Sequence, residues 1–123
     1  MNEDDIKYDY TQALIIDDEL DTCLLLGMLL KKFGIRSLMA HTLTTGLETL
    51  QHEKPQLIFL DNNLPDGTGI EHIKQLKGLL PEVTLIMISA ISSLKTEALI
   101  LGADGFIEKP LDLSKIKPFF QLY

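Results

Sequence analysis

Several side chains with acidic, cationic or hydroxyl chemistry stand directly after short apolar runs. They are Asp17, Asp18, Asp61, Ser89 and Lys109. Clustered carboxylates disfavour one another's ionisation and, with no His or Cys beside them, suit a hard cation such as Mg²⁺ or Mn²⁺. A lysine ammonium suits a phosphate oxygen, a hydroxyl adds a donor, and a carboxylate can act as the nucleophile. Together these residue types indicate a phosphoryl-transfer site.

The apolar runs predict the strands that would bring these side chains together. Three runs are apolar on both faces, as in buried parallel strands, and two weaker ones predict shorter or half-covered strands. In chain order the runs are 13–16, 37–40, 57–60, 85–88 and 105–108. Ligands of an open α/β sheet bind beyond the carboxyl ends of its strands. Asp and Ser also cap helices that follow strands, but the convergence of all these residues at one edge favours a shared site.

Stretches with helical spacing alternate with the apolar runs. They cover residues 20–33, 43–52, 69–77, 92–101 and 113–123, and Pro118 should kink or shorten the last of them. Five βα units with right-handed crossovers place helices on both faces of a parallel sheet. The sequence therefore predicts an α/β fold with a doubly wound, five-stranded parallel sheet.

Composition narrows the classes of function. The chain has 123 residues, the length of one domain, and a formal net charge of −7, which repels nucleic-acid phosphates and gives no polybasic membrane contact. No apolar run approaches the roughly 20 residues that span a bilayer, and a single cysteine, Cys23, excludes an intrachain disulfide. We expect a flexible acidic leader over 1–11, a domain over 12–123 and a cytoplasmic location.

Four motifs lie at the predicted strand ends in a fixed order. They are Ile-Ile-Asp-Asp-Glu at 15–19, Leu-Asp-Asn-Asn-Leu-Pro-Asp-Gly at 60–67, Ile-Ser-Ala at 88–90 and Gly-Ala-Asp-Gly-Phe-Ile-Glu-Lys-Pro at 102–110. With them the chain resembles the receiver domain of bacterial two-component response regulators, from about Gln12 to about Phe120. The resemblance implies a flavodoxin-like sheet with strand order 2-1-3-4-5.

The resemblance also implies a role for each site residue. Asp61 would accept a phosphoryl group from a histidine of a sensor kinase or histidine phosphotransfer protein. Asp18, Asp61 and the backbone carbonyl of Asn63 would bind Mg²⁺ directly, with Asp17 acting mostly through water. Lys109 and Ser89 would contact the phosphoryl oxygens. Phe106 stands at the position of the family's switch aromatic, and its other interpretation is a plain core residue of the last strand.

The resemblance further implies a readout on the face made by the fourth helix, the fifth strand and the fifth helix. Phe119, Phe120 and Tyr123 lie on or beside that face in this interpretation, which makes it a candidate surface for a partner or a homodimer. The alternative is that one or two of these aromatics simply complete the core. The family often carries Thr at position 89 and Tyr at position 106, so Ser89 keeps the hydroxyl whereas Phe106 lacks the phenol.

Three hypotheses for function follow. The first is a signalling switch, not an enzyme, that is phosphorylated on Asp61. The second is an aspartyl-phosphate phosphohydrolase, which needs a second acid two residues after the nucleophile, where this chain has Asn63. The third is a receiver-like module that binds a partner without regulation by phosphorylation. Because every expected site residue is present, the first is preferred.

Overall fold

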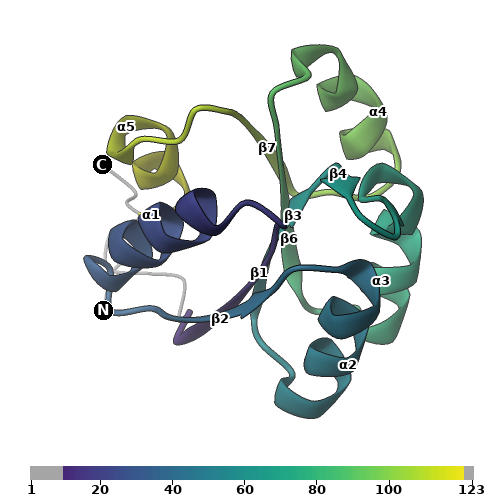
Figure 1. Ribbon diagram of the computed structural model, residues 1–123, viewed down its shortest axis with the longest axis horizontal. Helices are drawn as coiled ribbons and strands as arrows, with labels where there is room; N and C mark the ends of the chain where they lie inside the picture. The colour runs from purple at the N-terminus through teal and green to yellow at the C-terminus, as the bar shows by residue number, and fades with distance from the viewer. Residues whose placement is uncertain (1–9, 121–123) are drawn as a thin grey trace, which may run out of the picture.

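A computed structural model describes residues 10–120 and has a five-stranded parallel sheet at its centre (Figure 1). In chain order the strands of this sheet are β1 (Gln12–Ile16), β2 (Arg36–Ala40), β3 (Leu57–Asp61), β6 (Thr84–Ser89) and β7 (Gly105–Glu108). They lie side by side in the order β2-β1-β3-β6-β7, and all four pairings are parallel. Counting only these strands, the order is 2-1-3-4-5, so the predicted flavodoxin-like sheet is confirmed.

Helices cover both faces of the sheet, as predicted. Figure 1 shows α1 (Leu20–Lys31) and α5 (Leu113–Ile116) on one face, and α2 (Leu43–Glu53), α3 (Ile73–Leu79) and α4 (Lys95–Ile100) on the other. Short 3₁₀ turns precede α3 and α4, at Ile70–His72 and Ser92–Leu94, and a third, Lys117–Phe119, follows α5. This last turn contains Pro118, in agreement with the predicted shortening of the final helix. None of the helices in the described part of the chain is long and apolar enough to cross a membrane.

The core consists of two apolar layers separated by the sheet. Ala13 and Ile15 of β1 belong to the layer under α1 and α5, and Leu14 and Ile16 belong to the layer under α2, α3 and α4. Because alternate side chains of a strand point to opposite faces, a strand covered on both sides must be apolar throughout. This explains the continuous apolar runs and fixes the strand ends where the polar residues begin.

A small hairpin between β3 and α3 was not among the predicted elements. It pairs β4 (Asn63–Leu64) with β5 (Gly67–Thr68) in antiparallel fashion. Its Asp66 carboxylate accepts hydrogen bonds from the main-chain N–H of Leu43 at 2.8 Å and of Thr44 at 2.9 Å, at the start of α2. These two bonds lower the pKa of Asp66 to about 2. The hairpin therefore ties the segment after Asp61 to a neighbouring helix.

The aromatic residues near the chain end differ from the expectation of an exposed patch. Phe119 and Phe120 are half-buried and pack against the layer under α1 and α5, together with Tyr10 and Phe33. The Phe120 ring centroid lies 5.7 Å from that of Tyr10 and 5.2 Å from that of Phe33. The structure thus favours the alternative that these residues complete the core. Tyr123 and residues 1–9 of the acidic leader lie outside the described residues.

Candidate functional site

Four of the predicted side chains meet at the carboxyl-terminal edge of the sheet. Asp17 follows β1, Asp61 and Ser89 end β3 and β6, and Lys109 follows β7. The exposed fractions of Asp17, Asp61 and Ser89 are 0%, 4% and 1%. The ammonium nitrogen of Lys109 lies 3.0 Å from Oδ2 of Asp17 and 3.2 Å from Oδ1 of Asp61. Two buried carboxylates from neighbouring strands therefore share one cation.

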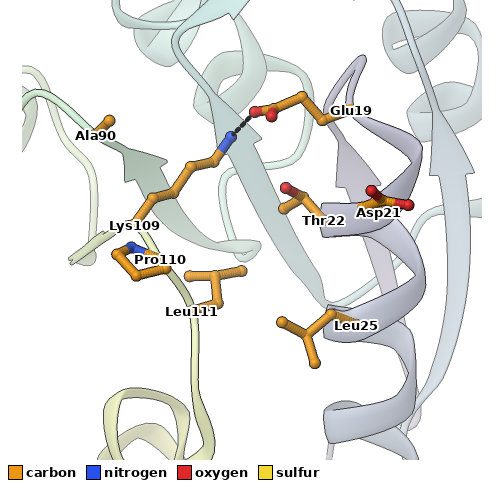
Figure 2. Close-up of a pocket in the computed structure, with 8 residues that line it drawn as sticks. All are labelled: Glu19, Asp21, Thr22, Leu25, Ala90, Lys109, Pro110 and Leu111. Atoms are coloured by element: carbon orange, nitrogen blue, oxygen red, sulfur yellow. Dashed lines mark hydrogen bonds and ion pairs between the residues drawn. The ribbon is translucent and has the colours of Figure 1, made fainter.

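The acidic cluster at this edge of the sheet includes one residue beyond the predicted ones. Glu19, which the sequence reasoning gave no role, places Oε1 2.7 Å from the Lys109 ammonium (Figure 2). Carboxylate oxygens of Asp17, Glu19 and Asp61 lie within 4.8 Å of one another. Asp18 is exposed and is not one of this group, and Asn63 is exposed on β4. The position of Glu19, two residues after Asp17, was the one signal in the sequence for this contact. The turn before α1 brings a side chain at that spacing back over the site.

Burial and like charge set the electrostatics of Asp61. Burial, followed by the negative charge of Asp17, raises its pKa to about 6, although Lys109 opposes both effects. For Lys109, burial lowers the pKa, but hydrogen bonds from its ammonium to Glu19 and Asp17 and the charges of Asp17 and Asp61 outweigh burial, so the pKa is raised. The lysine is thus a fixed positive charge, whereas the acid cluster as a whole carries more negative charge than one cation neutralises.

The main chain of Asp17 is held from several sides. Its N–H donates to the carbonyl oxygen of Ala40 at 3.0 Å. Its own carbonyl oxygen lies 2.9 Å from Nδ1 of His41 and accepts the S–H of Cys23 at 3.3 Å. Cys23 is buried, which raises the pKa of its thiol to about 11. His41 is exposed, and its contact with Asp17 was not predicted from the sequence, because nothing in the spacing shows that β2 ends beside Asp17.

The segment after Asp61 is packed closely against the loop that leads to α3. Gly69 donates its N–H to the carbonyl oxygen of Asn62 at 2.8 Å. A Cβ atom at Gly69 would clash with the main-chain oxygen of Asp61. Glycine at this position is therefore required by close backbone approach.

Ser89 and Phe106 lie on β6 and β7, the two strands that follow β3 across the sheet. The Ser89 hydroxyl oxygen accepts the N–H of Ile91 at 3.0 Å, and its carbonyl oxygen accepts the N–H of Lys109 at 2.9 Å. Phe106 pairs with Met87 in the sheet, is half-buried, and packs against the layer under α2, α3 and α4. The predicted switch residue is thus neither fully buried nor fully exposed.

A pocket of about 400 Å³ opens beside Lys109 between α1 and the segment after β7 (Figure 2). Its lining residues are Glu19, Asp21, Thr22, Leu25, Ala90, Lys109, Pro110 and Leu111. Next to it, α1 is apolar on its solvent side as well, with Leu20, Leu24 and Met28 exposed and Met28 reaching 68%. A site mouth bordered by an apolar helix face suits the approach of another protein.

The acid cluster fits a divalent cation. Oδ2 of Asp17 is buried, and its close polar contact among the described residues is the ion pair with the Lys109 ammonium at 3.0 Å, which Lys109 shares with Glu19 and Asp61. Asp61, raised in pKa by burial and by Asp17, would likewise be relieved by a positive ion. A set of carboxylate oxygens without nitrogen or sulfur ligands is the donor set that Mg²⁺ prefers.

Comparison with known proteins gives a consistent result. The family model described as "Response regulator receiver domain" matches residues 13–120. The chain is 39% identical over 109 residues to the KDP operon transcriptional regulatory protein KdpE of Escherichia coli, which covers 87% of this chain and 48% of that protein. It is 30% identical over 114 residues to sporulation initiation phosphotransferase F of Bacillus subtilis, which covers 91% of this chain and 92% of that protein.

A solved structure agrees with these relatives. The CheX-CheY-BeF3-Mg+2 complex from Borrelia burgdorferi matches with a TM-score of 0.82 and 26% sequence identity, over 89% of this chain and 85% of that one. The chain spans only about a quarter to a half of the length of several curated relatives, including the transcriptional regulatory protein ZraR of Klebsiella oxytoca at 24%.

Proposed function

Because this chain belongs to the response regulator receiver family, we propose that residues 12–123 act as a phosphorylation-dependent switch of a two-component system. The observation that carries the proposal is the contact of one ammonium, that of Lys109, with the two buried carboxylates of Asp17 and Asp61. The unit is a signalling phosphoacceptor rather than an enzyme with a separate substrate, and it works in the cytoplasm.

Asp61 is the nucleophile in this proposal. One carboxylate oxygen attacks the phosphorus of a phosphohistidine, so that a P–O bond forms while the P–N bond breaks and its electron pair returns to the imidazole. Burial keeps bulk water away from the acyl phosphate that results. Asp61 attacks as the carboxylate, and since its pKa is about 6 without a metal, it is mainly ionised at neutral pH.

The other site residues stabilise the transferred group. Lys109 neutralises charge on the phosphoryl oxygens, and Glu19, whose side chain is 62% exposed, is the carboxylate that those oxygens displace most easily from the ammonium. Ser89 donates its hydroxyl to a phosphoryl oxygen. Mg²⁺, when bound, would supply further charge neutralisation; Asp18, Asp61 and the carbonyl of Asn63 would hold it directly, and Asp17 through water. Mn²⁺ fits the same oxygen donors.

The phosphodonor is a sensor histidine kinase or a histidine phosphotransfer protein. The outer face of α1 carries exposed apolar side chains, and one of them, Leu25, also lines the pocket beside Lys109, so this helix offers a surface on which such a donor can dock. The name of the relative sporulation initiation phosphotransferase F supports this class of partner. With a net charge of −7, the domain binds neither nucleic acid nor membrane by itself.

The readout lies on the face made by α4, β7 and α5. When Ser89 turns toward the phosphoryl group, the half-buried Phe106 ring moves further inward, where apolar burial favours it. On α4, Leu99 and Ile100 are exposed large apolar residues that a partner or a second copy of the chain would cover. The Borrelia burgdorferi complex, in which CheY is found with CheX, BeF3 and Mg²⁺, supports a switch of this type.

A small phosphodonor tests the proposal directly. We expect acetyl phosphate and Mg²⁺ to add one phosphoryl group to the intact protein, seen by mass spectrometry. Asp61→Asn should abolish the adduct, while Glu48→Gln, which changes an exposed carboxylate on α2, should leave it unchanged. If wild type gains no adduct, or Asp61→Asn gains it at the wild-type rate, the proposal is wrong and a module that binds its partner without phosphorylation becomes the better hypothesis.

A further inference from the structure

Lys115 of α5, which is not one of the residues of the acid cluster, holds the main chain on both sides of Lys109. Its ammonium donates to the carbonyl oxygen of Glu108 at 3.0 Å and to that of Pro110 at 2.7 Å. These are the residues immediately before and after Lys109. A lysine ammonium has three donors, so one side chain of α5 satisfies both carbonyl groups at once.

We propose that Lys115 is a positioning residue, which fixes where the Lys109 ammonium stands relative to Asp61 and links that position to α5. The inference rests on the proposed function only for the work that Lys109 does on a phosphoryl group. The main-chain contacts of Lys115 stand without it.

The main chain of Lys109 is held by different partners on its two sides, the sheet before it and α5 after it. On the sheet side, the N–H of Lys109 donates to the carbonyl oxygen of Ser89 at 2.9 Å, which continues the β6–β7 pairing. Beyond Lys109 the chain leaves the sheet and turns toward α5. The two bonds from Lys115 hold the chain at this exit, so they decide the direction in which the Lys109 side chain leaves the backbone.

Lys115 is itself firmly placed. Its N–H donates to Oδ1 of Asp112 at 3.1 Å, the capping bond at the start of α5. Ile116, the next residue, is fully buried, and Leu111 before the helix is buried as well. The Lys115 side chain is half-exposed, so it adds little to the core and water can solvate the two carbonyl groups if it is removed. Its removal should therefore loosen the exit segment without unfolding the domain.

The placement has a consequence for signalling. When the Lys109 ammonium exchanges Glu19 for a phosphoryl oxygen, its main chain shifts with it, and the carbonyl groups of Glu108 and Pro110 are the neighbours that move first. Because both are bonded to Lys115, their displacement is passed to the first turn of α5. Coupling of this kind needs a physical link whose geometry both ends can change.

The test compares Lys115→Met, Lys115→Gln and Lys115→Arg with Lys117→Met, a matched control that removes the charge of the exposed Lys117 two residues later. The readouts are the rate of adduct formation with acetyl phosphate and Mg²⁺, the backbone amide shifts with and without beryllofluoride, and urea unfolding.

We expect Lys115→Met to slow adduct formation on the order of tenfold, since small displacements of catalytic groups have effects of this size. Its α5 amides should respond less to beryllofluoride, and its unfolding should stay close to that of wild type. Lys115→Arg, which keeps several donors, should restore most of the rate. Lys117→Met should resemble wild type. If Lys115→Met is unfolded, Lys115→Gln, which removes the charge but keeps the two N–H donors of its amide group, replaces it.

Unchanged rate and unchanged α5 response in Lys115→Met would overturn the inference, and so would an equal loss in Lys117→Met, which would indicate charge rather than position. Failure of the proposed function gives a different pattern, namely a wild-type protein that takes up neither phosphoryl nor beryllofluoride. In that case the amide resonance of Lys109 in the free protein decides. A shift in Lys115→Met but not in Lys117→Met supports positioning, and no shift in either refutes it.

Discussion

Replacing Asp61 by Asn should stabilise the protein in the absence of metal, even though it removes the proposed phosphoacceptor. Asp61 is 4% exposed, and the pKa of its carboxyl group is raised from 3.8 to about 6 by burial and by the charge of Asp17. A raised carboxyl pKa means that the folded state disfavours the ionised form. The Asn side chain has nearly the same shape and carries no charge to be penalised.

The sign and size of the effect follow from the two pKa values of Asp61. Below about pH 3.8 the carboxyl group is protonated in both states, so ionisation costs no stability there. Between about pH 4 and 6 the unfolded chain releases a proton that the folded protein keeps, and stability falls as pH rises. Above about pH 6 this loss of unfolding free energy is complete. At roughly 1.4 kcal/mol for each unit between the two pKa values, it amounts to about 3 kcal/mol. The contact with Lys109 at 3.2 Å already lowers this pKa, so its loss is included in that figure, and Asp61→Asn should gain up to about 3 kcal/mol.

Urea unfolding at about pH 4 and pH 7.5, with a chelator present, measures the difference. We expect Asp61→Asn to exceed wild type in unfolding free energy at the higher pH and to approach it at the lower. Added Mg²⁺ should narrow the gap, because an ion that binds the native wild type stabilises it by mass action. Glu48→Gln, at an exposed carboxylate, is the control for a lost surface charge. A gap of equal size at both pH values, or a variant less stable than wild type at pH 7.5, would refute the reasoning.

The remaining predictions concern the ligands and the loop around Asp61. Asp18→Ala should abolish the rise in melting temperature that Mg²⁺ produces, and an unchanged rise would remove Asp18 from the ligand set. Gly69→Ala should cost roughly 1–3 kcal/mol in urea unfolding, because its Cβ would clash with the main-chain oxygen of Asp61; a neutral result would contradict the close approach. Asp66→Ala should lower the melting temperature at neutral pH, and this deficit should fade as pH falls from about 3.8 through about 2, where wild type also loses the charge that caps α2. Ile91→Glu should shorten the lifetime of the phosphorylated form, measured by the decay of the adduct, because it replaces an apolar side chain beside Ser89 with one that can hold water.

The sheet could be predicted because the residue pattern that produces each strand lies within a few consecutive residues. A strand covered on both faces must be apolar at every position, and 57–60 and 85–88 are. The edge at which the polar residues meet then follows from parallel topology alone. The hairpin at 63–68 escaped prediction because two-residue strands have no periodicity. The hydrogen bond that ties it to α2 joins Asp66 to Leu43, 23 residues away in sequence.

Side-chain partners were less predictable than strand positions. Glu19 reaches Lys109 across 90 residues of sequence, and only the folded turn before α1 brings the two together. The aromatic residues Phe119 and Phe120 look exposed in a short final helix, but the layer under α1 has room for them beside Tyr10. Patterns of residue type were therefore enough to predict where the candidate site lies. The partner of each charged side chain could be identified only from the folded structure.

If Asp61 is phosphorylated as proposed, the charge balance of the site gives a physical reason why one phosphoryl group would affect residues far from it. Phosphorylation replaces a carboxylate that already lies beside Asp17 with a group that carries about −1.5 to −2 charges at neutral pH. Among the described residues, Lys109 is the cation paired with this acid cluster, so the added charge must be met by a bound metal, by the Ser89 hydroxyl and by a shift of Lys109. Lys109 is bonded through its main chain to β6 and through its neighbours to Lys115 of α5. In the proposed switch, a change at one carboxylate oxygen is therefore passed to β6, β7 and α5, of which β7 and α5 belong to the proposed readout face.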